Sequence, residues 1–185
     1  MVHLTFIRCA EMTADESISR NDAQKLFLLA KTVVEQFGKP QMLYCADNPN
    51  GILSAQVVNL ACGVHGIHAS TALNPSVNVY DAIAFIDFLA AEARNRNDVH
   101  IVMIGAPDTF RQLLHLRTHF GISYTLCANS WVNILHNYSQ IWSPFELNKA
   151  NPEMARELAD KLFNHPCSAD EMMLIERSLK VNATV

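Results

Sequence analysis

The segment VHIVMIG, residues 99–105, is nearly continuous apolar sequence that ends at a glycine. Such a run, without alternating polar positions, is typical of a parallel strand that helices cover on both faces. We therefore predict that these residues form a central strand of an α/β sheet.

Strand-like and helix-like segments alternate on both sides of this strand. Ser19 and Asp22 fit the N-cap of a helix, and Gly38 fits its C-terminal end. The residues between Ser19 and Gly38 are therefore predicted to form a helix that buries one apolar face. The predicted strands are 2–7, 41–46, 66–70 and edge strands within 130–142; the loop is 47–51; the predicted helices are 19–37, 52–62, 79–94, 108–120, 150–163 and 168–179. Repeated βαβ units predict a three-layer α/β/α sandwich with a mostly parallel sheet.

The length of 185 residues suits a single domain, 1–185, in which 150–185 is a helical C-terminal extension. The net charge is −4, the pI is about 6.0, and the basic residues are scattered, so neither nucleic acid nor an anionic membrane surface is an expected partner. No apolar run approaches the roughly 18 residues of a membrane span, and the first residues do not resemble a signal peptide. These features predict a cytoplasmic protein.

Five cysteines without a CxxC pair predict free, mostly buried thiols. Cys62, His65 and His68 have metal-like spacing, but a helix end and a strand would direct them differently, and no fourth ligand is evident. His115 and His119 lie on a polar helix face. We therefore predict neither a metal nor a cofactor.

In a parallel sheet, ligands bind beyond the carboxyl ends of the strands, where the strand order reverses. The loops after three predicted strands should therefore line one crevice. The candidate ligand-binding residues in these loops are Arg8, Cys9, Glu11, Asn48, Asn50, Gly105 and Asp108. The two asparagines are either ligand donors or turn formers.

Four short segments resemble the histidine phosphatase superfamily, the phosphoglycerate mutase-like fold, and most closely its small phosphohistidine phosphatase branch. FIRCAE stands where the family has Arg-His-Gly-Glu, and PNGILSAQVV stands where it has Ser-Pro-Leu-x-Arg-Ala-x-Gln. Residues 73–75 (LNP) match a Leu-x-Pro of the small phosphohistidine phosphatase branch. Residues 105–108 (GAPD) occur where that branch has Gly-His-x-Pro-Asp. The resemblance spans about residues 4–147, and within it Trp142 stands in the place of a tryptophan near the end of that branch.

The resemblance implies the family's fold but not its reaction. Cys9 and Ala106 replace the two catalytic histidines, and Leu53 replaces a phosphate-binding arginine. Phosphoryl transfer depends on an aligned nucleophile and on cations around the phosphoryl oxygens. We therefore predict a catalytically inactive binding or regulatory protein that recognises a protein partner or a small anionic or phosphorylated ligand. The alternative is a phosphatase or other hydrolase with a non-standard site built from Cys9, Glu11 and Asp108.

Several side chains keep two interpretations at this stage. Arg8 either binds an anion or pairs with Glu11 or Asp108. A Cys9 nucleophile is disfavoured because cysteine phosphatases use Cys-x5-Arg, and the corresponding position here is Asp15. Phe85, Phe88 and Phe110 are expected in the core. The last helix, with Met172, Met173, Ile175 and Leu179, either forms a homo-oligomer contact or packs on its own domain.

Overall fold

The computed structural model describes residues 2–96, 99–117, 131–136, 143–144, 160 and 167–180. Its strands are β1 (Val2–Arg8), β2 (Met42–Ala46), β3 (Ile67–Ser70), β4 (Val99–Gly105), β5 (Trp131–His136) and β6 (Ser143–Pro144). They form one sheet in the order β3-β2-β4-β1-β5-β6. The first four strands are parallel, and β5 runs antiparallel to β1 and β6. Every residue of β4 is buried, as predicted for the central strand.

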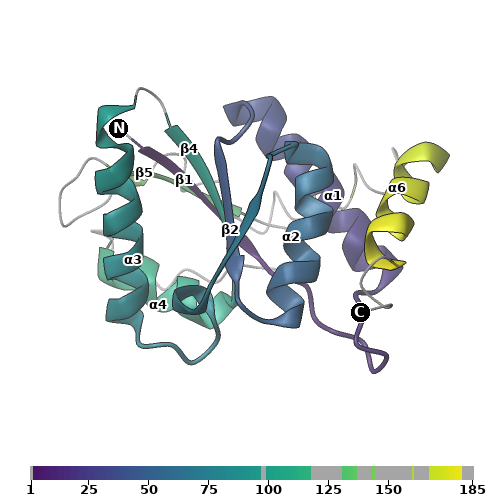
Figure 1. Ribbon diagram of the computed structural model, residues 1–185, viewed down its shortest axis with the longest axis horizontal. Coiled ribbons are helices and arrows are strands. Elements are labelled where there is room, and N and C mark those ends of the chain that lie inside the picture. The colour runs from purple at the N-terminus through teal and green to yellow at the C-terminus, as the bar shows by residue number, and fades with distance from the viewer. Residues whose placement is uncertain are drawn as a thin grey trace.

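Helices cover both faces of this sheet. They are α1 (Arg20–Phe37), α2 (Pro49–Cys62), α3 (Val79–Glu92), α4 (Pro107–Arg117) and α6 (Ala169–Lys180), with short 3-10 turns at Thr71–Leu73 and Ala93–Asn95. Figure 1 shows α3 and α4 on one side of the strands and α1, α2 and α6 on the other. The predicted three-layer α/β/α sandwich with a mostly parallel sheet is confirmed.

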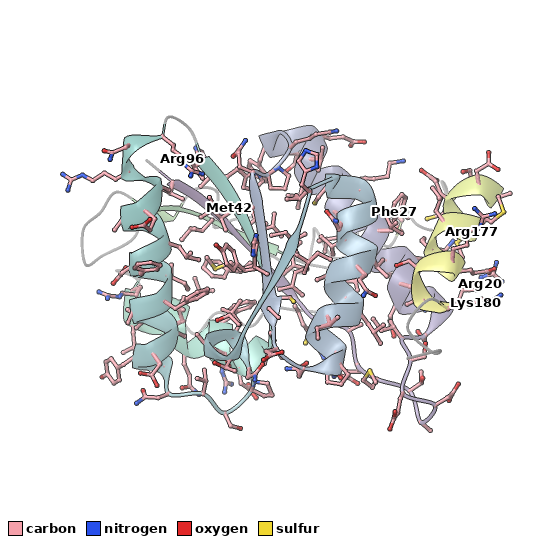
Figure 2. The ribbon with its side chains drawn as sticks, in the orientation of Figure 1. Arg20, Phe27, Met42, Arg96, Arg177 and Lys180 are labelled. Atoms are coloured by element: carbon pink, nitrogen blue, oxygen red, sulfur yellow. The ribbon has the colours of Figure 1, made fainter. Side chains whose placement is uncertain are left out.

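Each face of the sheet has its own apolar core. Leu4 and Phe6 of β1 face α3 and α4, where the Phe6 ring meets the Phe110 ring at 5.0 Å between centroids. Ile7 of β1 and Val102 of β4 face α1 and α2 instead. Figure 2 shows these layers with their side chains. The alternation of strand side chains between two faces therefore builds both cores from the same strands.

Local capping explains most helix boundaries and one error of prediction. The Ser19 side chain accepts a hydrogen bond from the Asp22 amide, and Gly38 closes α1 with a positive φ of 79°. The prediction that the loop extends to residue 51 was wrong, because α2 already begins at Pro49. Asn48 caps that helix by accepting from the Gly51 amide at 2.9 Å, and proline is favourable in the first helical turn.

The C-terminal helix α6 packs on its own domain. Met172 and Ile175 are buried in the core shared with α1 and α2. Lys31 of α1 also pairs with Glu171 at 2.7 Å. Of the two interpretations of this helix, the structure shows packing within the domain, while a homo-oligomer through the C-terminal helices stays a prediction. The predicted helix 150–163 lies outside the described residues, apart from residue 160, which is helical.

Three smaller expectations have different outcomes. Phe110 is fully buried and Phe85 partly so, but the prediction for Phe88 was wrong, because this ring is 59% exposed on the outer face of α3. Helix α3 ends at Glu92, two residues before the predicted end, and continues as a 3-10 turn. His119, Cys127 and Trp142 lie outside the described residues.

None of the helices in the described part of the chain has the length and hydropathy that crossing a membrane requires.

Candidate functional site

The strand order reverses between β1 and β4. From β1 the chain crosses to β2 and β3 on one side, whereas from β4 it leads past β1 to β5 on the other. Arg8 and Gly105 are paired at the ends of these adjacent strands, and the Cys9 amide donates to the Gly105 carbonyl at 3.0 Å. A crevice is expected where two neighbouring parallel strands send their connections in opposite directions.

A pocket of about 500 Å³ lies at this reversal. Its lining residues are Arg8, Cys9, Ala10, Glu11, Asn48, Asn50, Asn74, Pro75, Ala106, Pro107 and Asp108. The fold therefore brings together all the candidate ligand-binding residues except Gly105. That glycine lies behind the wall, where an added Cβ would come within 2.8 Å of the Phe110 ring and 3.0 Å of the Leu73 carbonyl oxygen.

The three positions that correspond to reactive family residues are placed differently from one another. Cys9 and Ala106 line the pocket. Leu53 does not line it, because its side chain is buried in the core under α2. The next residue, Ser54, is fully buried and accepts a hydrogen bond from the Ala10 amide at 2.9 Å. Helix α2 therefore anchors the loop after β1.

The charged side chains of the pocket are engaged in ion pairs. The Arg8 guanidinium donates to the Glu11 carboxylate at 2.6 Å; the Arg8 side chain is 26% exposed and that of Glu11 is 82% exposed. Asp108 pairs with Arg111 at 3.2 Å instead of with Arg8. Of the alternatives left open for Arg8, the structure shows the pair with Glu11. One guanidinium and two carboxylates thus belong to the lining residues.

The Cys9 thiol is a poor nucleophile in this environment. Burial raises its pKa, the Arg8 charge and a hydrogen bond to the backbone lower it, and the Glu11 charge raises it, so that the net shift is upward. A cysteine attacks as the thiolate, which is already a minor species at neutral pH for an ordinary thiol. Cys9 therefore contributes a neutral thiol to the wall of the pocket. Cys45, Cys62 and Cys167 are also free and are buried, as the sequence predicts.

Two asparagines join the loops that form one side of the pocket. The side-chain amide of Asn48 donates to the side-chain oxygen of Asn74 at 3.2 Å, and the side-chain amide of Asn74 donates to the backbone carbonyl of Asp47 at 3.3 Å. The Thr109 hydroxyl donates to the Asn74 carbonyl at 3.0 Å, which ties the first turn of α4 to the same loop. Both asparagines line the pocket: Asn48 also caps α2 and bridges to Asn74, and Asn50 lies in the first turn of α2.

Sequence reasoning missed Asn74 and Pro75 as lining residues. They follow β3 and its 3-10 turn, and in the sequence the segment Leu73-Asn74-Pro75 stands out only as a family-like motif. The rule that ligands bind at the carboxyl ends of parallel strands would have found them if it had also been applied to β3.

The metal-like spacing around Cys62 does not produce a cluster. Cys62 is buried at the end of α2, where burial raises its pKa to about 12, while the His68 ring lies against Tyr44 at 5.1 Å between centroids. Within the described residues, no three His, Cys, Asp or Glu side chains are grouped so that they could hold a metal ion.

Gly51 holds the start of α2 close to the end of β2. A Cβ at this position would lie 2.4 Å from the Ala46 carbonyl oxygen and 2.8 Å from the Ala46 Cβ. We expect Gly51→Ala to lower the free energy of unfolding by about 1 to 3 kcal/mol, because the helix must move away from the strand. Urea unfolding measures this loss. Gly66→Ala is the matched control, since its Cβ would meet nothing nearer than 3.9 Å; equal losses in both variants would contradict the close approach.

The chain has the fold of the histidine phosphatase superfamily. Among similar solved structures is the protein histidine phosphatase SixA in complex with tungstate, with 11% identity, coverage of 77% of this chain and 94% of SixA, and a TM-score of 0.69. Another is a histidine-to-alanine variant of phosphoserine phosphatase from Entamoeba histolytica in complex with phosphoserine, with 11% identity, coverage of 82% and 98%, and a TM-score of 0.57.

A third similar structure is mycobacterial glucosyl-3-phosphoglycerate phosphatase, with 12% identity, coverage of 77% of this chain and 96% of the phosphatase, and a TM-score of 0.59. No protein-family model and no curated protein matches the sequence. At identities this low, the likeness establishes the shared fold alone. The predicted phosphoglycerate mutase-like architecture is confirmed.

Proposed function

We propose that this protein is a catalytically inactive histidine-phosphatase-like domain that binds a small anionic or phosphorylated ligand in the pocket at the carboxyl ends of β1 and β4. The observation that carries the proposal is the set of residues at the reactive positions. Cys9 carries a thiol of raised pKa, Ala106 has no side chain that can transfer a proton, and Leu53 is buried away from the pocket. A site in which both histidines of the family are replaced has lost the cooperating groups on which turnover depends.

The binding part of the proposal is supported by the groups that remain. Arg8 lines the pocket, and the first turn of α2 reaches it through Asn50. Helix N-termini and a guanidinium both favour anions. A volume of about 500 Å³ lies within the range of small-molecule sites. The phosphoserine phosphatase variant in complex with phosphoserine, which has the same fold, is an example of a ligand complex in the presence of a histidine-to-alanine change.

A non-standard hydrolase at this pocket is not favoured. Its nucleophile would be the Cys9 thiol, whose pKa is raised by burial. Its acid or base would be Glu11 or Asp108, and each of these carboxylates is held by an arginine, Arg8 and Arg111 respectively. A carboxylate that is held by a guanidinium must leave that pair before it can contact a substrate.

We expect no phosphate release above the buffer blank when the purified protein is incubated with phosphoproteins, phosphosugars and an aryl phosphate. Phosphate release is measured colorimetrically, with SixA as the positive control. Turnover that is lost in Cys9→Ser would contradict the inactive assignment and would support the hydrolase alternative. Turnover that is retained in Cys9→Ser would point to a contaminating phosphatase.

Ligand binding is tested separately from activity. We expect inorganic phosphate or tungstate to shift the side-chain resonance of Arg8 in NMR spectra of the labelled protein, and Arg8→Gln to abolish binding. Binding that survives in Arg8→Gln would place the anion outside this pocket and would overturn the binding part of the proposal.

A further inference from the structure

We propose that Glu11 is an internal competitor of the anionic ligand: its carboxylate occupies the Arg8 guanidinium, and a ligand binds by displacing it. The inference rests on the proposed function, because it concerns the regulation of the same pocket. It assigns to Glu11 an autoinhibitory contact that sets the affinity of the site.

The first support is the geometry of the pair. The Arg8 Nη2 donates to the Glu11 Oε1 at 2.6 Å, and both residues line the pocket. Arg8 is the last residue of β1 and is fixed by pairing with Gly105 of β4. A carboxylate bound to this guanidinium takes a hydrogen-bonding position that a phosphoryl oxygen of a ligand would also use.

The second support is the difference in exposure between the partners. The Arg8 side chain is 26% exposed, whereas that of Glu11 is 82% exposed and comes from the loop after the strand. Glu11 can therefore leave the pair and return to water without moving the framework. The guanidinium stays behind at the wall of the pocket. This asymmetry suits a contact in which one partner is fixed and the other is displaced.

The third support is the balance of charge. Among the described residues that line the pocket, Arg8 is the only Lys or Arg, and Glu11 and Asp108 are the acids. The Asp108 charge is already met by Arg111 at 3.2 Å, so the carboxylate that neutralises Arg8 is that of Glu11. An incoming anion thus meets a cation whose charge is compensated until Glu11 moves away.

The size of the effect follows from the exposure of the pair. Ion pairs of this kind contribute up to about 1 kcal/mol, which corresponds to about a fivefold change in affinity. Removing the Glu11 charge also removes its repulsion of the ligand, which acts in the same direction. A ligand with two oxygens in position for the planar guanidinium has an advantage over the single carboxylate contact that the structure shows.

The test compares phosphate affinity in four proteins by calorimetry at constant ionic strength: the wild type, Glu11→Gln, Glu16→Gln and the double variant Arg8→Gln/Glu11→Gln. Glu16 is the matched control, because it is an exposed acid of the same loop and its replacement removes the same formal charge. We expect Glu11→Gln to bind phosphate about fivefold more tightly than the wild type. Glu16→Gln should bind as the wild type does, and the double variant should lose binding.

Three outcomes would overturn the inference, and they are distinguishable. If the wild type binds phosphate and Glu11→Gln binds it no better, the competition is refuted while the proposed function survives. If Glu11→Gln and Glu16→Gln gain equally, the effect is one of net charge and not of the contact with Arg8. If no variant binds phosphate, both this inference and the anion-binding function fail. Matching urea midpoints of the variants establish that each is folded.

Discussion

Replacing Ile175 by alanine is expected to lower the free energy of unfolding by about 2 to 4 kcal/mol. Ile175 is fully buried in the core that α6 shares with α1 and α2. Truncation to alanine removes apolar contacts and leaves a cavity between packed helices, which cannot close completely. Urea unfolding followed by circular dichroism measures the loss.

The neighbouring position provides the control for this change. Leu174 is 49% exposed on the same helix, so Leu174→Ala should change the free energy of unfolding by no more than about 0.5 kcal/mol. Equal effects at the two positions would show that α6 does not pack on the domain in solution. The pair of variants therefore tests the placement of the C-terminal helix and not merely its helical propensity.

The free energy of unfolding is expected to fall as the pH drops from about 6.5 toward 4, by up to about 3 kcal/mol from His100 alone. This side chain is 4% exposed at the start of β4, and burial lowers its pKa to about 4, aided by the charge of His3. The imidazole lies 2.8 Å from the Thr5 hydroxyl and 3.3 Å from the Gly38 carbonyl.

The direction follows from proton binding. In the folded protein His100 takes up its proton near pH 4, whereas in the unfolded chain an ordinary imidazole takes it up near 6.5. Between these values the unfolded chain binds more protons, so acid favours unfolding. The contribution is complete above about pH 6.5 and is lost as the pH falls toward 4.

Urea unfolding between pH 7 and pH 4.5 measures this dependence. His100→Gln should lose less stability on acidification than the wild type, because it has no imidazole to protonate at this position. His115→Gln, which removes an exposed imidazole on α4, should retain the steep wild-type fall. Parallel curves for the wild type and His100→Gln would contradict the buried, neutral state of His100.

Local sequence patterns predicted most of the strands and helices, because these elements depend mainly on interactions between residues that are close in sequence. The apolar run 99–105 was identified as the central strand, since a strand with two buried faces carries no polar alternation. The Ser19 cap and the Gly38 stop were also found, as each depends on neighbouring residues alone. Phe88 was misplaced because helical periodicity indicates that residues share a face and not whether another element covers that face.

The candidate site was predictable to the level of loops and less so to the level of contacts. The position of Cys9 and of Ala106 at the ends of strands follows from the chain order, as does their meeting at one edge of the sheet. The choice of partner for Arg8 did not follow, because Glu11 and Asp108 both lie in the pocket. The role of Asn74 depends on hydrogen bonds to Asn48 and Thr109, which are far away in sequence.

The sequence by itself determined the alternation of strands and helices and the replacement of the expected imidazoles by Cys9 and Ala106. Only the tertiary structure decided that Arg8 is held by Glu11, because the loop carrying Glu11 is fixed by bonds to distant segments. The Cys9 amide donates to Gly105, and the Ala10 amide donates to Ser54. The sequence specifies which residues the loop contains, but the conformation of the loop depends on its hydrogen bonds to segments that only the folded chain brings near.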